Sequence, residues 1–317
     1  MSKTSARLYS WDKSSITERR PHVIHDKGRW RKFVAAGATA LIAALFAVSP
    51  LRGDDPRRLG EAWFKKLVVI GLTADSRLVW FRAGFPDKTG EIGSVYGLIS
   101  PDTSLVGIDY RVQDGRLYGV GNGGGIYTID TENARATFVN SLTVPLSGSF
   151  FGVDFNPAAD RLRIISDTGQ NLAHNVNAGG ITALNATLTY TAPPAAPIAA
   201  LGVNGAAYTN NDLNQPSTAT TLFDIDTTMD QVVIQSPPGN GILVATGKLG
   251  FDADAQAGFD IYSRLVSGVT MQNRAFASLA VNKTYGFYQI SLLTGAATLL
   301  GNFDESVVDI AIPLDQR

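Results

Sequence analysis

A short pattern that ends in an acidic or amide residue recurs along the chain. An apolar residue, a glycine and a second apolar residue precede Asp or Asn in the segments LVGID, FFGVD, ALGVN and KLGFD, and SVVDI near the C-terminus repeats the last part. Aligned in this way, the segments place five side chains at one position: Asp109, Asp154, Asn204, Asp252 and Asp309. Hard cations prefer carboxylate and amide oxygens. If these side chains converge, they would bind calcium or a cationic ligand.

The spacing of these segments indicates a repeat fold. They begin roughly 45 to 50 residues apart, which is close to the ~40–45-residue period of a propeller blade with four strands. Between them lie short β-branched and aromatic runs separated by turn residues, a pattern typical of an all-β fold. Each unit is interpreted as an inner strand, a second strand, an aromatic strand and an outer strand. The sequence therefore predicts a β-propeller.

We expect five blades from this repeat. Their ranges are 67–100 together with 306–313, then 103–143, 148–190, 196–236 and 246–302. The C-terminal strand would supply the inner strand that the first blade lacks, and it would close the ring so that no sheet edge is left unpaired. The last blade is long enough to hide a small sixth blade.

Inner strands of a propeller surround a central channel, so the five aligned side chains would form a polar ring near the axis. In the first four segments a glycine lies two residues earlier, on the same face of the strand, where crowding favours a residue without a side chain. Like charges this close raise one another's pKa unless a cation or backbone amides compensate. The alternative is that each aspartate caps its own turn and points away from the channel.

The stretch GVDFNPAADRLRII offers a second, local calcium hypothesis. Asp154, Asn156 and Asp160 have the oxygen-rich spacing of a calcium-binding loop. The stretch lacks the Gly at position six and the Glu at position twelve that such loops use. Asp, Asn and Pro are also common residues of turns. We therefore expect a hairpin here, from which only Asp154 reaches the axial ring.

Catalytic groupings are scarce. The chain has no cysteine, and His174 is the only histidine in residues 67–317, which excludes a cysteine nucleophile and a histidine-rich metal centre there. A Ser-His-Asp triad would depend on His174, for which the sequence indicates no partners. GVGNGG at 119–124 matches a dinucleotide-binding pattern, but a strand follows where that site requires a helix. A carboxylate pair for glycoside hydrolysis stays open, because its spacing in space is not readable from sequence.

The N-terminal part is expected to direct the protein out of the cytoplasm. Residues 33–51 are an uncharged apolar run, just long enough to cross a bilayer as a helix. The basic leader at 1–32 would stay in the cytoplasm by the positive-inside rule. The run is either a retained anchor or a cleaved signal segment, and a linker at 52–66 leads to the propeller at 67–317. Either way, we expect the propeller in the periplasm or outside the cell.

Charge is distributed unevenly and bears on partners. Residues 1–66 carry 14 Lys and Arg against 6 Asp and Glu, whereas residues 67–317 carry 13 against 22. An acidic folded part repels phosphates, so we expect no nucleic acid partner. We expect a monomer that meets the membrane only through its N-terminal segment and binds an as yet unknown protein or small molecule.

One family resemblance covers most of the chain. The segment FFGVDFNPAADRLRIISDTGQNL, with DGRLYGV and GGIYTID before it and GFDIYSRLVSG and RAFASLAV after it, resembles a bacterial family of exported proteins known as domain of unknown function 4394. The resemblance runs from about Val68 to Pro313 and implies a propeller-like fold. The family implies no established activity, catalytic residue or cofactor. NLAHNVNAGG and TENARAT depart from the family's more usual turn sequences, which bears on the turns.

Three functional hypotheses remain open from the sequence. The first is a non-catalytic binding module or scaffold, with calcium as its candidate axial cation. The second is a propeller hydrolase or lactonase-like enzyme that uses the axial carboxylates as metal ligands or as a general base. The third is a purely structural component of the cell envelope.

Overall fold

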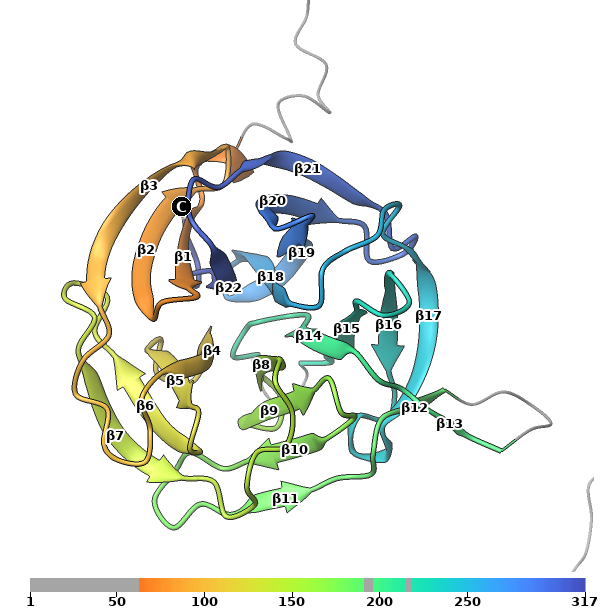
Figure 1. Cartoon of the computed structure of the whole chain (residues 1–317), viewed down its shortest axis with the longest axis horizontal. Helices are drawn as coiled ribbons and strands as arrows, with labels where there is room; N and C mark the ends of the chain where they lie inside the picture. The colour runs from red at the N-terminus through yellow and green to blue at the C-terminus, as the bar shows by residue number, and fades with distance from the viewer. Residues whose placement is uncertain (1–62, 191–195, 215–217, 317) are drawn as a thin grey trace, which may run out of the picture. The chain divides into compact units, whose positions relative to one another are not determined.

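The computed structural model describes residues 63–190, 196–214 and 218–316. In this part of the chain, five β-sheets are arranged as a ring about a central axis (Figure 1). The five-bladed β-propeller predicted from the repeat is therefore confirmed. A short 3₁₀-helix, η1 (Phe64–Lys66), precedes the first strand, and a second, η2 (Pro238–Asn240), lies before the outer strand of the fourth blade.

Each blade is an antiparallel sheet whose first strand in the list lies nearest the axis. Blade 1 consists of β22 (Val307–Ala311), β1 (Val68–Thr73), β2 (Arg77–Arg82) and β3 (Phe85–Ser94). Blade 2 consists of β4 (Leu105–Tyr110), β5 (Leu117–Gly121), β6 (Gly125–Ile129) and β7 (Ala136–Ser141). Blade 3 consists of β8 (Phe151–Asn156), β9 (Arg161–Ser166), β10 (Asn171–His174) and β11 (Thr182–Leu184).

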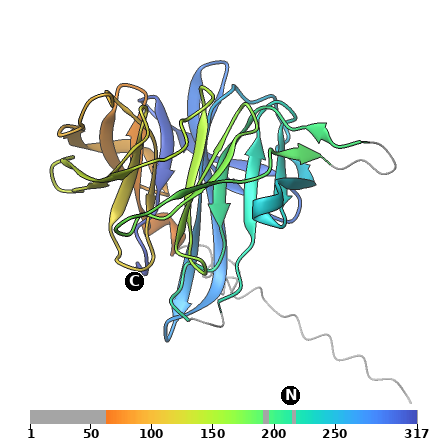
Figure 2. The same cartoon turned by 90° about the horizontal axis from the view of Figure 1, so that it is seen from below.

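The last two blades are longer. Blade 4 consists of β14 (Val203–Tyr208), β15 (Leu222–Asp226), β16 (Gln231–Gln235) and β17 (Ile242–Lys248), extended at its edge by β12 (Thr189–Tyr190) and β13 (Ile198–Ala199). Blade 5 consists of β18 (Ala257–Val266), β19 (Val269–Val281), β20 (Thr284–Ile290) and β21 (Ala297–Asn302). The β18–β19 hairpin extends beyond the neighbouring strands when the ring is viewed from the side (Figure 2).

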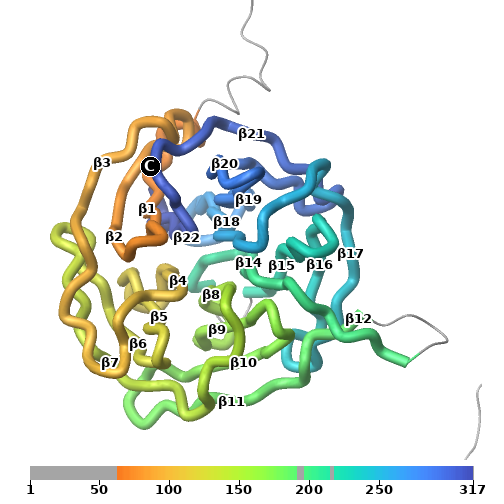
Figure 3. Tube along the Cα trace, viewed as in Figure 1, coloured from red at the N-terminus to blue at the C-terminus, as the bar shows by residue number. Residues whose placement is uncertain are grey.

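The two ends of the propeller meet in blade 1. Strand β22 pairs antiparallel with β1, and Ile70 faces Ala311 in this register. The trace in Figure 3 shows the C-terminus beside the first strands of the propeller. The predicted closure by the C-terminal strand is confirmed, and it hydrogen-bonds the free edge of β1.

The boundary between blades 4 and 5 differs from the prediction. β17 pairs with β16 as the outer strand of blade 4, so residues 242–248 do not open blade 5. Blade 5 begins at Ala257, and its length comes from the long β18–β19 hairpin. No sixth blade occurs among the residues that the structure describes.

Apolar side chains fill each of the five junctions between neighbouring blades. Five buried clusters occur, and each draws its members from two adjacent blades. At the seam between blades 5 and 1, the Phe81 ring contacts Phe287 and Phe303 edge-on, with centroids 5.0 Å apart in both pairs. Burial on both faces explains why the strands are rich in β-branched and aromatic residues.

The predicted leader and apolar segment, residues 1–32 and 33–51, lie outside the described residues. Within the described residues, no helix has the length and apolar character needed to span a membrane.

Candidate functional site

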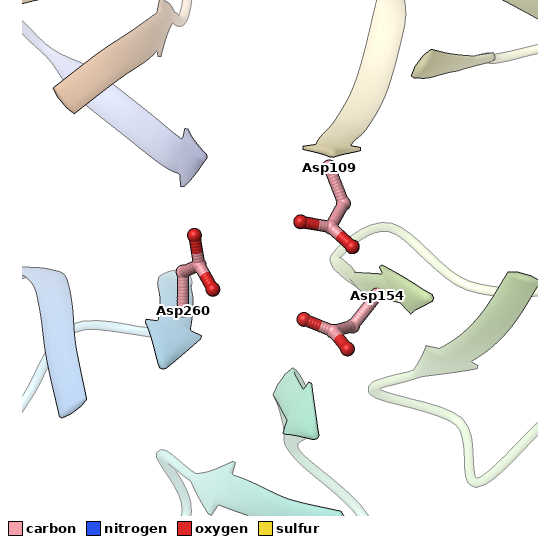
Figure 4. Close-up of side chains that lie close together, drawn as sticks. All are labelled: Asp109, Asp154 and Asp260. Atoms are coloured by element: carbon pink, nitrogen blue, oxygen red, sulfur yellow. The ribbon is translucent and has the colours of Figure 1, made fainter. Parts of the chain in front are cut away.

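Three carboxylates converge at the centre of the ring. Asp109 on β4, Asp154 on β8 and Asp260 on β18 each direct a side chain toward the axis, and one oxygen from each lies within 4.8 Å of the other two (Figure 4). All three are buried, with exposed fractions of 6%, 1% and 3%. We refer to these three residues as the axial triad. The predicted polar ring is therefore present in part, with a changed membership.

Asp252 does not belong to the axial triad. It lies in the segment that precedes β18, and its side chain is exposed. The segment KLGFDADAQAGFDIYS contains Gly-Phe-Asp twice, and the second copy, which ends at Asp260, lies on the inner strand. Ala257 to Ser263 is buried at every position, so a continuous apolar run was the sequence signal for the inner strand.

Asp309 lies at a different level along the axis. Its Oδ2 accepts a hydrogen bond of 2.8 Å from the amide of Ile108. Asp109 instead accepts from Phe155, one residue beyond Asp154. Asp309 therefore lies beside the glycine level of the inner strands, about 7 Å from the triad level, because two residues separate the levels.

Asn204 also lies outside the triad. Ala207 occupies the corresponding position on β14, because the next residue, Tyr208, donates its amide to Asp154 Oδ1 over 3.0 Å. The Asn204 side chain instead donates 2.6 Å to the carbonyl of Ala255, just before β18. Its own oxygen is buried without a hydrogen-bond partner.

Hydrogen bonds from these side chains join the inner strands of all five blade pairs. Between blades 1 and 2, Asp309 accepts from Ile108, and between blades 5 and 1, Asp260 accepts from Ile312 over 2.6 Å. The complete set, here named the junction bonds, is Asp309–Ile108, Asp109–Phe155, Asp154–Tyr208, Asn204–Ala255 and Asp260–Ile312. The aligned repeat residues therefore connect neighbouring blades rather than capping turns within their own blades.

Glycines allow the inner strands to approach one another. A Cβ at Gly152 would lie 2.7 Å from the backbone nitrogen of Ala206. A Cβ at Gly258 would lie 2.5 Å from the Cα of Asp309. The prediction that crowding requires glycine is confirmed, although in blade 4 the matching residue is Gly205 and not Gly202.

Burial dominates the electrostatics of the axis. It raises the pKa of Asp109 and Asp154 well above the ordinary value, and neighbouring carboxylates raise these pKa values further. Burial raises the pKa of Asp260 to about 7, against the lowering effect of amide hydrogen bonds from Ile312 and Ile261. No basic side chain is among the main influences on these pKa values. The triad therefore requires protons or a cation to remain close together.

The dimensions of the axial triad suit calcium. Two oxygens on opposite sides of a calcium ion, each about 2.3–2.6 Å away, lie about 4.6–5.2 Å apart. Since each triad carboxylate gives one oxygen to a junction bond, a second oxygen remains that could bind an ion. Water would complete the six to eight ligands that calcium usually takes.

A pocket of about 230 Å³ opens on the axis where the inner strands begin. It is lined by uncharged groups, among them Ser104, Ser149, Gln256, Phe151 and Val308. No member of the axial triad lines this pocket. A molecule in the pocket would therefore not contact the three carboxylates.

The other motifs have structural roles. GVGNGG leads into strand β6, as predicted, so the helix that a dinucleotide site needs is missing there. His174 is buried, and its ring nitrogens lie 3.0 Å from Thr182 Oγ1 and from Asn140 Oδ1. Burial lowers the pKa of His174 to about 4. This neutral, hydrogen-bonded histidine matches the non-catalytic interpretation of the sequence.

The stretch after Asp154 forms the predicted hairpin. Asn156 Oδ1 accepts hydrogen bonds of 2.9 Å from the amides of Ala158 and Ala159 in the turn between β8 and β9. Asp160 has a φ of 50° and its carboxylate accepts 2.8 Å from Arg111 Nε. Neither side chain belongs to the axial triad.

The family model of the domain of unknown function DUF4394 matches residues 77–311. The chain belongs to the DUF4394 family. This confirms the resemblance seen in the sequence, and the match spans all five blades. No curated protein sequence matches the chain.

Solved structures with related architecture are distant. A protein of unknown function from Bacteroides thetaiotaomicron is 10% identical over 79% of this chain and 67% of its own, with a TM-score of 0.42. A protein from Lactobacillus plantarum is 15% identical over 75% and 66%, with a TM-score of 0.35. An auxiliary nutrient binding protein from B. thetaiotaomicron is 12% identical over 66% and 55%, with a TM-score of 0.36. This DUF4394 protein thus spans about two thirds or less of their lengths, and no property of theirs is transferred to it.

Proposed function

We propose that this protein is an extracytoplasmic, non-catalytic binding module or scaffold whose axial triad binds a divalent cation, with calcium as the favoured ion. One observation carries the proposal: three buried carboxylates place oxygens within 4.8 Å of one another. With one cation between them, the same carboxylates would hold the inner strands of blades 2, 3 and 5 together. The ion would then stabilise the ring from which ligand-binding loops project.

The arrangement favours binding over catalysis. A hydrolase that used these carboxylates as metal ligands would need a substrate to reach them. The axial pocket contains none of the triad residues, and Asp154 is only 1% exposed. Each triad carboxylate also gives one oxygen to a backbone amide of the next blade, which suits a structural role.

The extracytoplasmic location is part of the proposal and has a separate basis. It is supported by the apolar run at 33–51 and by the basic residues before it. Calcium is an appropriate ion outside the cytoplasm, where modules with dissociation constants of about 10⁻⁴–10⁻³ M are common.

The thermal midpoint of the full-length protein tests the cation. It would be measured in EDTA and then in millimolar calcium, for the wild type and for Asp154→Asn and Asp260→Asn. Binding to the native state alone stabilises by about 2.7 kcal/mol at a hundredfold excess over the dissociation constant. For a domain of about 250 residues this corresponds to a rise of roughly 5–10 °C.

Asp252→Asn is the matched control, because Asp252 is an exposed aspartate outside the triad. The proposal predicts a calcium response in the wild type and the control and its loss in the two triad variants. An unchanged wild-type midpoint would contradict calcium binding. A response that only Asp252→Asn abolishes would place the ion elsewhere.

A further inference from the structure

A second site lies on the outer part of blade 1, away from the axial triad. A pocket of about 280 Å³ is lined by Trp80 and Arg82 from β2 and by Phe85 and Lys88 from β3. The two aromatic side chains are 41% and 51% exposed. Large aromatic side chains exposed together with cations are unusual on a protein surface and often mark binding sites.

An excursion of β3 creates this pocket. Trp80 pairs with Gly90, but Arg82 already pairs with Phe85, so residues 86–89 of β3 lie opposite the single residue Phe81 of β2. The four residues therefore leave the ladder. The face of β2 that carries Trp80 and Arg82 is uncovered as a result.

The excursion is held in place by blade 5 and the loop after it. Pro86 packs against Gly301, where a Cβ would lie 2.7 Å from the proline Cγ. Thr89 Oγ1 donates a hydrogen bond of 3.0 Å to Glu305 Oε1. The walls of the pocket are therefore preformed, which lowers the entropic cost of binding.

The indole of Trp80 lies on the backbone of the opposite strand. A Cβ added to Gly90 would be 2.5 Å from the indole Cε2, and closer still to Nε1. Glycine at position 90 therefore allows one face of the ring to rest on β3. The exposed surface of the ring remains available for a flat apolar partner.

Two positive charges at the pocket have no carboxylate partner among the described residues. Arg82 forms no ion pair or hydrogen bond there, and the Lys88 ammonium lies 5.6 Å from the centre of the Phe85 ring. Asp87 and Glu91 are on the same strand but do not line the pocket. The pocket is thus a basic place on a domain with an excess of acidic residues.

We propose that Trp80, Arg82, Phe85 and Lys88 bind an acidic carbohydrate, with the C–H face of a pyranose ring on the aromatic surfaces and its carboxylate at the two cations. A uronic acid unit offers both an apolar face and a negative charge. An acidic peptide offers the charge without a rigid apolar face. The site is independent of the axial triad and does not require calcium.

The test measures binding of trigalacturonate to the full-length protein by calorimetry, with a neutral galactose trisaccharide as the matched sugar. We expect the acidic trisaccharide to bind at least tenfold more tightly than the neutral one. Trp80→Ala and Arg82→Gln should each weaken binding at least fivefold, and binding should weaken as salt rises. Lys283→Gln, an exposed lysine on blade 5, should bind like the wild type.

Several outcomes would overturn the proposal. They are no binding of trigalacturonate, equal binding of the neutral trisaccharide, and unchanged affinity in both Trp80→Ala and Arg82→Gln. Triglutamate that binds as tightly as trigalacturonate would instead identify an acidic peptide site. Gly90→Ala provides a further check, since it should displace the indole and weaken binding while both cations stay in place. Thermal midpoints equal to that of the wild type would show that the variants are folded.

Discussion

The carboxylate of Asp309 accepts a hydrogen bond of 2.8 Å from the backbone amide of Ile108, across the junction between blades 1 and 2. Asp309 is on β22, the last strand of the chain, which also pairs with β1 and receives the Asp260 junction bond at Ile312. The C-terminal strand is therefore attached to three partners: its own blade and both neighbouring blades. Closure of the ring depends on these side chains as well as on strand pairing.

Asp309→Ala should destabilise the protein. The change leaves the buried amide of Ile108 without its acceptor, which costs about 1–3 kcal/mol. Denaturation in urea would measure the free energy of unfolding. Asp304→Ala changes an exposed aspartate five residues earlier and should have little effect. Equal unfolding free energies for the two variants would show that the Asp309 junction bond does not contribute to stability.

The axial triad should make stability depend on pH when calcium is removed. The folded-state pKa of Asp260 is about 7, above the ordinary value of 3.8, so the folded state holds its proton more tightly than the unfolded state does. Stability is then highest at low pH and falls as the pH rises from about 4 to about 7. Relative to Asp260→Asn in EDTA, the wild type should lose a few kcal/mol across this window and change little above it.

His174 affects stability in the opposite direction over an overlapping range. Its folded-state pKa is about 4, below the ordinary 6.5, so its contribution is lost as the pH falls from about 6.5 toward 4. The effect is common to the wild type and Asp260→Asn and cancels when their unfolding curves are compared. A difference between the two proteins that stays constant from pH 4 to pH 8 would contradict a raised pKa of Asp260.

Close approach of the inner strands predicts a large difference between two glycines. Gly152→Ala would bring a methyl group within 2.7 Å of the backbone of blade 4, and overpacking of this kind costs about 1–3 kcal/mol. The nearest atom to a Cβ at Gly239 is 3.8 Å away, so Gly239→Ala should be nearly neutral. Thermal unfolding of both variants tests this, and similar midpoints would show that the strands can move apart.

Much of the fold was predictable because it depends on local repetition. The repeat segments identified the inner strands of blades 2 and 3, and with them Asp109 and Asp154. The unpaired pattern at 306–313 predicted closure with the first blade. Each of these inferences uses strand period and turn residues, which are local properties of the chain.

The rest of the axial site depends on pairing between distant segments. Gly-Phe-Asp occurs twice within KLGFDADAQAGFDIYS, and only the copy at Asp260 lies on a strand that is buried on both faces. In blade 4 the carboxylate position is occupied by Ala207, while Asn204 reaches blade 5 from an earlier position. Asp309 is displaced by one level along the axis. Such offsets arise from the register of neighbouring blades, which a local pattern does not contain.

Calorimetric titration of calcium into the full-length protein at pH 7.5 tests the central claim most directly. The account predicts one calcium ion per chain in the wild type and in Asp252→Asn, with binding abolished or weakened at least tenfold in Asp154→Asn and Asp260→Asn. No heat of binding in the wild type, or binding that the two triad variants retain, would contradict an axial cation site.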